Sequence, residues 1–130
     1  MKIQRRWLAG ALTLALVAMP AWAEIKVGMV APFSGAASSL GEGMKRGIEA
    51  RFAEVNEAGG VHGESLTLVT RDDGYEPLRS AKATRELLDD DEVLAMLGNV
   101  GTPTAIVNLP ILLEHEMPLI GALTGSGVLR

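Results

Sequence analysis

Three segments of this chain bring glycine together with serine or threonine, a pairing of residue types that can bind a small anion. The segments are 32–40, 100–104 and 123–127. Glycine lets a ligand approach the backbone closely, while hydroxyl groups and the free N–H groups of a helix start can hold a carboxylate. Thr102 is the sharpest case, because its hydroxyl coincides with a helix start that Pro103 predicts. Simple capping of that helix, without any ligand, is the competing interpretation.

The residue types that most often serve catalysis do not form a catalytic set here. Asp72 and Asp73 are adjacent acids after an apolar run, which favours a turn over a carboxylate pair or a metal site. His62 and His115 are isolated and lack the spacing of metal ligands. Ser126 lies between two glycines, but the five-residue Gly-x-Ser-x-Gly pattern of a nucleophile is absent. The sequence therefore predicts neither an enzyme nor a metal site.

A nucleotide cofactor is not expected either. The first apolar run leads into Ser-Gly-Ala-Ala-Ser-Ser-Leu-Gly at 34–41, where a dinucleotide-binding strand would be followed by Gly-x-Gly-x-x-Gly. Gly43 and Gly47 are four residues apart, one too many for that pattern, and no loop ends in Gly-Lys-Ser/Thr. We expect Gly41, Gly43 and Gly47 to let the helix that carries them pack closely, and we expect no cofactor.

Short apolar runs alternate with helical patterns along the rest of the chain, and these elements must position the candidate loops. Strands are predicted over 25–30, 66–70, 93–97 and 118–123. Helices are predicted over 40–55, over 77–88 and from Thr102 onward. Pro110 should kink or shorten the last of these helices, because its ring removes a backbone donor.

Continuous apolar strands joined by helices predict an α/β fold, a doubly wound parallel sheet with helices on both faces. In such a sheet ligands bind outside the carboxyl ends of the strands. Four segments are expected there, namely 32–40, 72–77, 100–104 and 123–127. The fourth strand runs into a glycine-rich loop without a covering helix, so we interpret 24–130 as an incomplete lobe of a longer protein.

The first 23 residues predict a cleavable secretory signal peptide. Lys2, Arg5 and Arg6 precede an uncharged run over 7–19, and Ala-Trp-Ala at 21–23 forms the cleavage site. The alternative is a membrane anchor, but thirteen apolar residues fall short of the roughly 20 needed to span a bilayer. We therefore expect a periplasmic protein whose working part begins near Glu24.

Charge and cysteine content narrow the possible partners. All 16 acidic residues but only 9 of the 12 basic ones follow Ala23, so the chain from Glu24 onward has a net charge of −7. An acidic surface argues against nucleic acid or an anionic membrane as partner. Because the chain has no cysteine, stability outside the cytoplasm must come from a packed core rather than from disulfides.

Taken in order, several of these motifs resemble those of a known family, the periplasmic substrate-binding proteins of branched-chain amino acid ABC transporters. The most specific is Asn-x-Ala-Gly-Gly-Val-x-Gly over 56–63. The others are weak singly but strong in this order and spacing, and they lie at 25–28, 32–35, 72–74 and 98–104. The resemblance covers the chain from Ile25 to its end and implies the first lobe of a two-lobed, type I solute-binding fold.

The resemblance implies capture of an amino acid or an amino-acid-like small molecule and its delivery to a membrane permease, by a protein expected to be a monomer. In such proteins a residue at the position of Thr102 holds the ligand carboxylate through its hydroxyl and N–H, and the loop after the fourth strand holds carboxylate and ammonium. A second lobe should supply the acid that pairs with the ammonium, so residues 1–130 alone should bind ligand weakly or not at all. The ligand-binding residues expected are Leu40, Tyr75, Gly101, Thr102, Leu123, Thr124 and Gly125.

Three departures from the family pattern bear on ligand choice. Leucine-binding relatives have an aromatic residue where Leu40 stands, and some carry a cysteine pair where this chain has Tyr75 and Gly101. Thr-Gly-Ser at 124–126 only approximates an Ala-Thr-Asn-type loop. Amides, urea or aromatic acids are therefore alternative ligands. A ligand-sensing module of a signalling protein and an exported α/β enzyme are the alternative functions.

Overall fold

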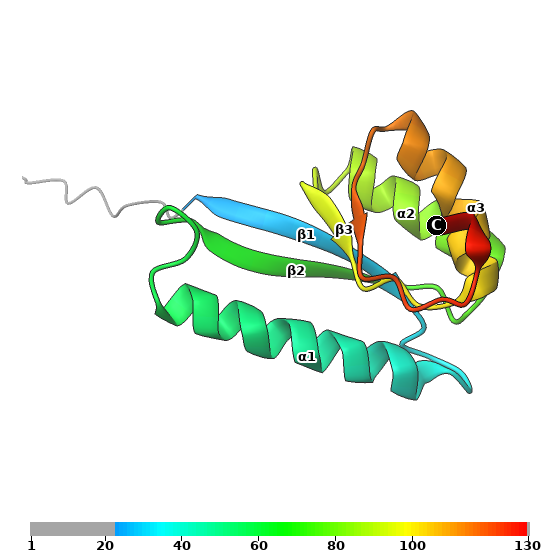
Figure 1. Ribbon diagram of the computed structural model, residues 1–130, viewed down its shortest axis with the longest axis horizontal. Helices are drawn as coiled ribbons and strands as arrows, with labels where there is room; N and C mark the ends of the chain where they lie inside the picture. The colour runs from blue at the N-terminus through cyan, green and yellow to red at the C-terminus, as the bar shows by residue number, and fades with distance from the viewer. Residues whose placement is uncertain (1–22, 130) are drawn as a thin grey trace, which may run out of the picture.

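A computed structural model describes residues 23–129 of the chain, as four strands and three helices with one short 3₁₀ turn (Figure 1). The signal peptide predicted for residues 1–23 falls outside the described residues except for Ala23. The elements are β1 (Glu24–Ala31), α1 (Ser38–Glu57), β2 (Ser65–Asp72), α2 (Pro77–Asp89), β3 (Ala95–Leu97), α3 (Thr102–Glu114), β4 (Leu119–Ile120) and η1 (Gly127–Leu129). The predicted alternation of strands and helices is confirmed.

The four strands form one parallel sheet in the order β2-β1-β3-β4. β1 and β2 are paired along their whole length, from Glu24 opposite Ser65 to Ala31 opposite Asp72. β3 shares only two residue pairs with β1 and two with β4. Because the chain moves outward from β1 to β2 and then returns past β1 to β3, the direction of winding reverses between β1 and β3. Parallel sheets place their ligand crevice at this reversal, beyond the carboxyl ends of the strands.

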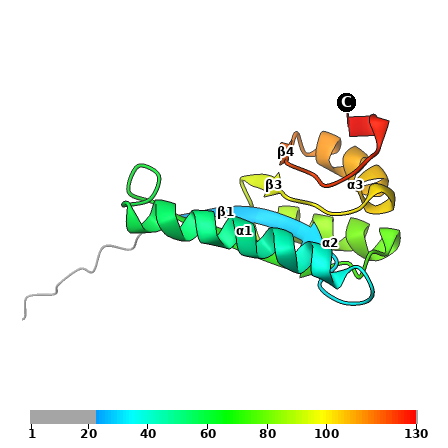
Figure 2. The same ribbon diagram turned by 60° about the horizontal axis from the view of Figure 1, so that its bottom comes forward.

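The two faces of the sheet are covered by different helices, as the sequence predicts for a doubly wound fold. Met29 and Ala31 pack on one face with Met44 and Ile48 of α1. Val30 points the other way, because successive side chains of a strand alternate. It packs on the face covered by α2 and α3, and Figure 2 shows α1 on the opposite side of the sheet from these two helices.

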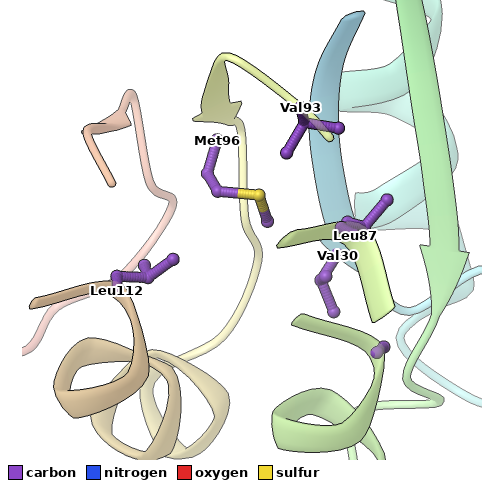
Figure 3. Close-up of a cluster of buried hydrophobic side chains, with 6 residues drawn as sticks. Val30, Leu87, Val93, Met96 and Leu112 are labelled. Carbon is purple, nitrogen blue, oxygen red and sulfur yellow. The ribbon is translucent and has the colours of Figure 1, made fainter. Parts of the chain in front are cut away.

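The larger core cluster lies between the sheet and the pair α2 and α3. Figure 3 shows its side chains converging from strands and helices that are far apart in the sequence. Leu87 and Met96 are completely buried, and no cysteine or aromatic ring takes part in this cluster. Its members are Val30, Ala83, Leu87, Val93, Met96 and Leu112. An aliphatic core is thus built from elements of both halves of the sheet.

Two expectations about the later elements need correction. Regular β4 covers only Leu119–Ile120, although an isolated parallel bridge between Val100 and Leu123 extends the contact with the neighbouring segment. Pro110 does not shorten α3, which continues through it to Glu114. Among residues 23–129 no helix is both long and apolar enough to cross a bilayer.

Only one of the three glycines of α1 fits the close packing that we expected of them. A Cβ at Gly41 would lie 2.1 Å from the carbonyl oxygen of Pro32, so only glycine allows α1 to approach the end of β1 this closely. A Cβ at Gly43 or Gly47 would meet nothing within 4 Å. The expectation is therefore wrong for these two residues, which border an open hollow beside Leu97.

The specific motif over 56–63 builds the turn from α1 to β2. The side-chain amide of Asn56 donates to the carbonyl oxygen of Leu66 at 2.9 Å, and its oxygen accepts the N–H of Leu66 at 2.8 Å. Gly60 has φ of 73°, and a Cβ there would lie 2.1 Å from the carbonyl oxygen of Glu64. The motif therefore has a structural task at the amino end of β2, away from the carboxyl-end loops.

Candidate functional site

The loops that follow the four strands meet at the carboxyl end of the sheet, as the sequence predicts. The backbone N–H groups of Phe33 and Ser34 donate to Oδ1 of Asp72 at 2.8 and 3.2 Å, which ties the exit of β1 to that of β2. The N–H of Gly101 donates to the carbonyl oxygen of Leu123 at 3.0 Å, tying the exit of β3 to that of β4. Segments distant in the sequence are thus fixed together at the winding reversal.

These loops surround an open pocket of about 240 Å³. All seven residues that the sequence analysis expected at a ligand border this pocket, and Val100 is the one member that it missed. Val100 could have been found, because it stands directly beyond a predicted strand at the ligand-binding end. The lining residues are Leu40, Tyr75, Val100, Gly101, Thr102, Leu123, Thr124 and Gly125.

Thr102 does not cap α3 as predicted. Gly101 occupies the cap position with φ of 119°, and its carbonyl oxygen accepts the first helical hydrogen bond from the N–H of Ala105 at 3.0 Å. Thr102 is instead the first helical residue, and its hydroxyl shares a hydrogen bond of 2.9 Å with the hydroxyl of Thr124. The N–H of Ser126 also donates to Oγ1 of Thr124, at 3.1 Å. The result is a pair of hydroxyls on the pocket wall at the start of a helix.

The pocket combines this polar edge with apolar walls. Leu40, Tyr75 and Leu123 are each between a third and a half exposed, which is high for large apolar side chains. None of the pocket's lining residues carries a charge. A small molecule with one anionic end and one apolar end would therefore find hydroxyl groups and helix N–H groups for the first and aliphatic carbon for the second.

Asp72 ties together the segments that follow β1 and β2, a role that the sequence analysis missed. Besides the two N–H groups from the exit of β1, Oδ1 accepts the N–H of Gly74 at 2.9 Å, and Oδ2 accepts the hydroxyl of Ser34 at 2.6 Å and Arg79 at 2.9 Å. Burial alone would raise the pKa of Asp72, but these donors, led by the Ser34 hydroxyl, hold that pKa well below its ordinary value. The bond to Gly74 closes an Asx turn, and the Asp-Asp-Gly sequence was the available signal for it.

Asp73 faces the opposite way from its neighbour and is completely buried. Its Oδ1 accepts the N–H of Tyr75 at 2.8 Å, whereas Oδ2 has no partner among the described residues. Burial raises the pKa of Asp73, an effect that the hydrogen bond from Tyr75 partly opposes. The turn predicted at these two acids is present, because the side chain of Asp72 accepts the N–H of Gly74. Within residues 23–129 no three potential metal ligands cluster.

The other residues considered for chemistry lie elsewhere or have other contacts. His62 is in the turn between α1 and β2, and His115 follows the end of α3, so both are at the amino end of the sheet.

A larger hollow of about 640 Å³ lies beside α3 and β4, and half of its lining residues are leucines, such as Leu109, Leu113 and Leu119. It reaches Thr124 and Ser126 but lacks the helix start and the converging loops of the smaller pocket.

Comparisons with known proteins agree on one family. A model of the family described as periplasmic binding protein matches residues 24–128. A Leu/Ile/Val-binding protein homolog 2 from Brucella abortus is 33% identical over 120 residues, which is 91% of this chain and 32% of that protein. The chain thus spans about a third of the length of the curated relatives that it matches first.

Solved structures give the same result. A possible leucine/isoleucine/valine-binding protein from Rhodopirellula baltica superposes with a TM-score of 0.83 and 44% identity, over 87% of this chain and 31% of that one. The substrate binding protein of a branched-chain amino acid transporter from Streptococcus pneumoniae, solved with isoleucine, gives a TM-score of 0.73 and 25% identity, over 79% of this chain and 30% of that one. Both matches cover less than a third of the neighbour.

Proposed function

Because the chain belongs to the periplasmic binding protein family and has part of a type I lobe, we propose that its protein is a receptor for an amino acid or an amino-acid-like acid. The observation that carries the proposal is the position of the pocket. The starts of α1 and α3 and the segments after β2, β3 and β4 line it at the winding reversal of the sheet, with the hydroxyls of Thr102 and Thr124 side by side. The relatives' names support an amino acid as the ligand class.

The ligand carboxylate would bind at the start of α3. Four N–H groups at a helix start lack partners within the helix, and the helix dipole favours negative charge there. The hydroxyls of Thr102 and Thr124 can rotate to donate to an oxygen in the pocket, since each is both donor and acceptor. The side chain of the ligand would lie against Leu40, Val100 and Leu123. An acidic residue from a second lobe would pair with the ligand ammonium.

The cellular setting of the receptor is part of the same proposal. Residues 1–23 would be removed as a signal peptide, and the lobe beginning at Glu24 would act in the periplasm as a monomer without catalytic activity. A membrane permease of an ABC transporter would receive the ligand. The streptococcal relative, which belongs to a branched-chain amino acid transporter, supports this assignment.

Replacing Thr102 tests the proposal directly. In the full-length protein, Thr102→Ala should weaken amino acid binding by about 1.5–3 kcal/mol, the cost of a lost hydrogen bond to a charged group. Isothermal titration calorimetry measures this, after a thermal-shift screen of amino acids, amides and aromatic acids has identified a ligand. Thr67→Ala in β2 is the matched control, because Thr67 lies outside the pocket. An unchanged affinity in Thr102→Ala would remove this residue from the site.

A further inference from the structure

The ring of Tyr75 lies against the start of α3 by its phenolic end. A Cβ at Gly101 would be 2.8 Å from Cε2 of Tyr75 and 3.3 Å from its Cζ. The hydroxyl oxygen is bonded to Cζ, so it lies at the same end of the ring, beside the residue that caps α3. The absence of a side chain at Gly101 is what leaves room for this ring.

The hydroxyl of Tyr75 is not used by the fold. Within residues 23–129 it has no hydrogen-bond partner, and the residue is 38% exposed at the wall of the pocket. A tyrosine hydroxyl is both donor and acceptor, so at a partly exposed pocket wall it is open to a ligand oxygen. Thr102 and Thr124 place two further hydroxyls on the same pocket. The pocket therefore offers three hydroxyl groups and no charged side chain near the start of one helix.

The backbone of Tyr75 is held in a conformation that an aromatic residue rarely adopts. Its φ is 69°, in the left-handed region, where a non-glycine residue is strained unless its surroundings fix it. The fixing contact is the hydrogen bond from the Tyr75 N–H to Oδ1 of Asp73, which is itself completely buried. The hydroxyl of Ser80 also lies close enough to Asp73 to lower its pKa, so the buried carboxyl is held from both sides and fixes the backbone of Tyr75.

From this geometry we propose that the Tyr75 hydroxyl is a third donor to the ligand carboxylate, and that Asp73 is the positioning residue that holds it there. The inference rests on the proposed function and deepens it. Hydrogen bonds to an ionised acceptor are roughly twice as strong as those between neutral groups. The site therefore selects free carboxylic acids over their primary amides, since an amide offers only one neutral acceptor oxygen.

Tyr75→Phe in the full-length protein tests the donor. The probes are the twenty protein amino acids and, for each one that binds, its primary α-amide, with calorimetry as the measurement. We expect Tyr75→Phe to weaken binding of the acid about ten-fold or more and binding of the amide much less, so the ratio of the two affinities falls. An unchanged ratio overturns the inference and leaves the proposed function standing. Wild-type protein that binds none of the twenty amino acids and none of the amino-acid-like acids in the thermal-shift screen overturns both.

Asp73 variants test the positioning role. Asp73→Asn keeps an oxygen that can accept the Tyr75 N–H, so its acid-to-amide ratio should remain that of wild type. Asp73→Ala should lower the ratio as Tyr75→Phe does. If Asp73→Ala fails to fold, Asp73→Leu removes the same acceptor while filling the buried space and must lower the ratio. The positioning role is overturned if the variant that removes the acceptor folds and keeps the wild-type ratio. It is also overturned if Asp73→Asn lowers the ratio.

Discussion

Two side chains of similar size, Asn56 and Asp72, tie the chain together at opposite ends of β2. Asn56 joins the end of α1 to the start of β2 through two hydrogen bonds to one residue, Leu66. Asp72 joins the exits of β1 and β2 through both oxygens and meets a guanidinium, that of Arg79. The first connection is neutral, and the second is charged.

The neutral connection lies at the end of the sheet that has only a structural turn, and the charged one lies at the end that has the pocket. In the turn over 56–63, both bonds of the Asn56 side chain go to the backbone of Leu66, and the N–H groups of Gly59 and Gly60 donate to the end of α1. At the carboxyl end, Asp72 holds the segments after β1 and β2 from outside the pocket, and the hydroxyls of Thr102, Thr124 and Tyr75 belong to residues of the pocket wall. The comparison predicts that changes in the turn alter stability and leave ligand affinity unchanged.

The largest effect is expected from Gly60→Ala. The new Cβ would overlap the carbonyl oxygen of Glu64, and alanine is strained at the φ of 73° found here. We expect a loss of more than about 2 kcal/mol in the free energy of unfolding, measured by urea denaturation of the full-length protein. Gly59→Ala is the matched control, because it has φ of 104° but open space around a Cβ. Equal losses in the two variants would contradict the steric argument.

A smaller loss of stability is expected from Asn56→Ala. The substitution leaves the N–H and the carbonyl oxygen of Leu66 without their partner, at a cost of about 1–3 kcal/mol in the free energy of unfolding. Glu57→Ala at the same exposed helix end should stay within about 0.5 kcal/mol of wild type. Calorimetry on the folded variant should give the wild-type affinity for the ligand. A change in that affinity would contradict the assignment of stability to the turn and of ligand binding to the carboxyl-end loops.

The smallest effect at neutral pH, and the one that depends on pH, is expected from Asp72→Asn. The amide oxygen of Asn can still accept the three backbone N–H groups that bind Oδ1, so the variant loses mainly the bonds of Oδ2 to Ser34 and Arg79. The ion pair with Arg79 is partly exposed and contributes about 1 kcal/mol or less. Because the folded pKa of Asp72 is lowered, its contribution is present above the unfolded value of about 3.9 and is lost as pH falls further. The difference in melting temperature between wild type and Asp72→Asn should therefore shrink below about pH 4. A constant difference from pH 7 to pH 3, or an equal pH dependence in the exposed control Asp90→Asn, would contradict this.

The sequence predicted the elements and the loops of the pocket because their signals are local. The apolar runs and the Gly-Gly stop of the first helix predicted elements close to those observed, and parallel topology then placed their following loops at one edge. The family resemblance added individual pocket residues such as Leu40 and Tyr75, which periodicity does not distinguish from packing residues. Family and fold class are confirmed by the comparisons, whereas ligand binding by the pocket residues stays a prediction.

The errors arose where a tertiary contact decided the outcome. Thr102 has the residue type of a cap, but Gly101 took that place at a φ that favours glycine, and the Thr102 hydroxyl found Thr124 instead. Gly41 and Gly43 look alike in the sequence, yet only Gly41 faces Pro32. The several bonds of Asp72 join residues up to 39 positions apart, which no local pattern specifies.

The unequal pairing of the strands gives the pocket two walls of different local stability. Tyr75 follows β2, which pairs with β1 over eight residues, whereas Thr102 and Thr124 follow β3 and β4, which share two pairs. The β4 exit is held to β3 by these two pairs and by the bridge between Val100 and Leu123, which is less pairing than β1 and β2 share, so we expect this side to open at a lower free energy. A ligand that contacts both walls would bind only while β3 and β4 are paired. Its binding would therefore stabilise the edge of the sheet against local opening.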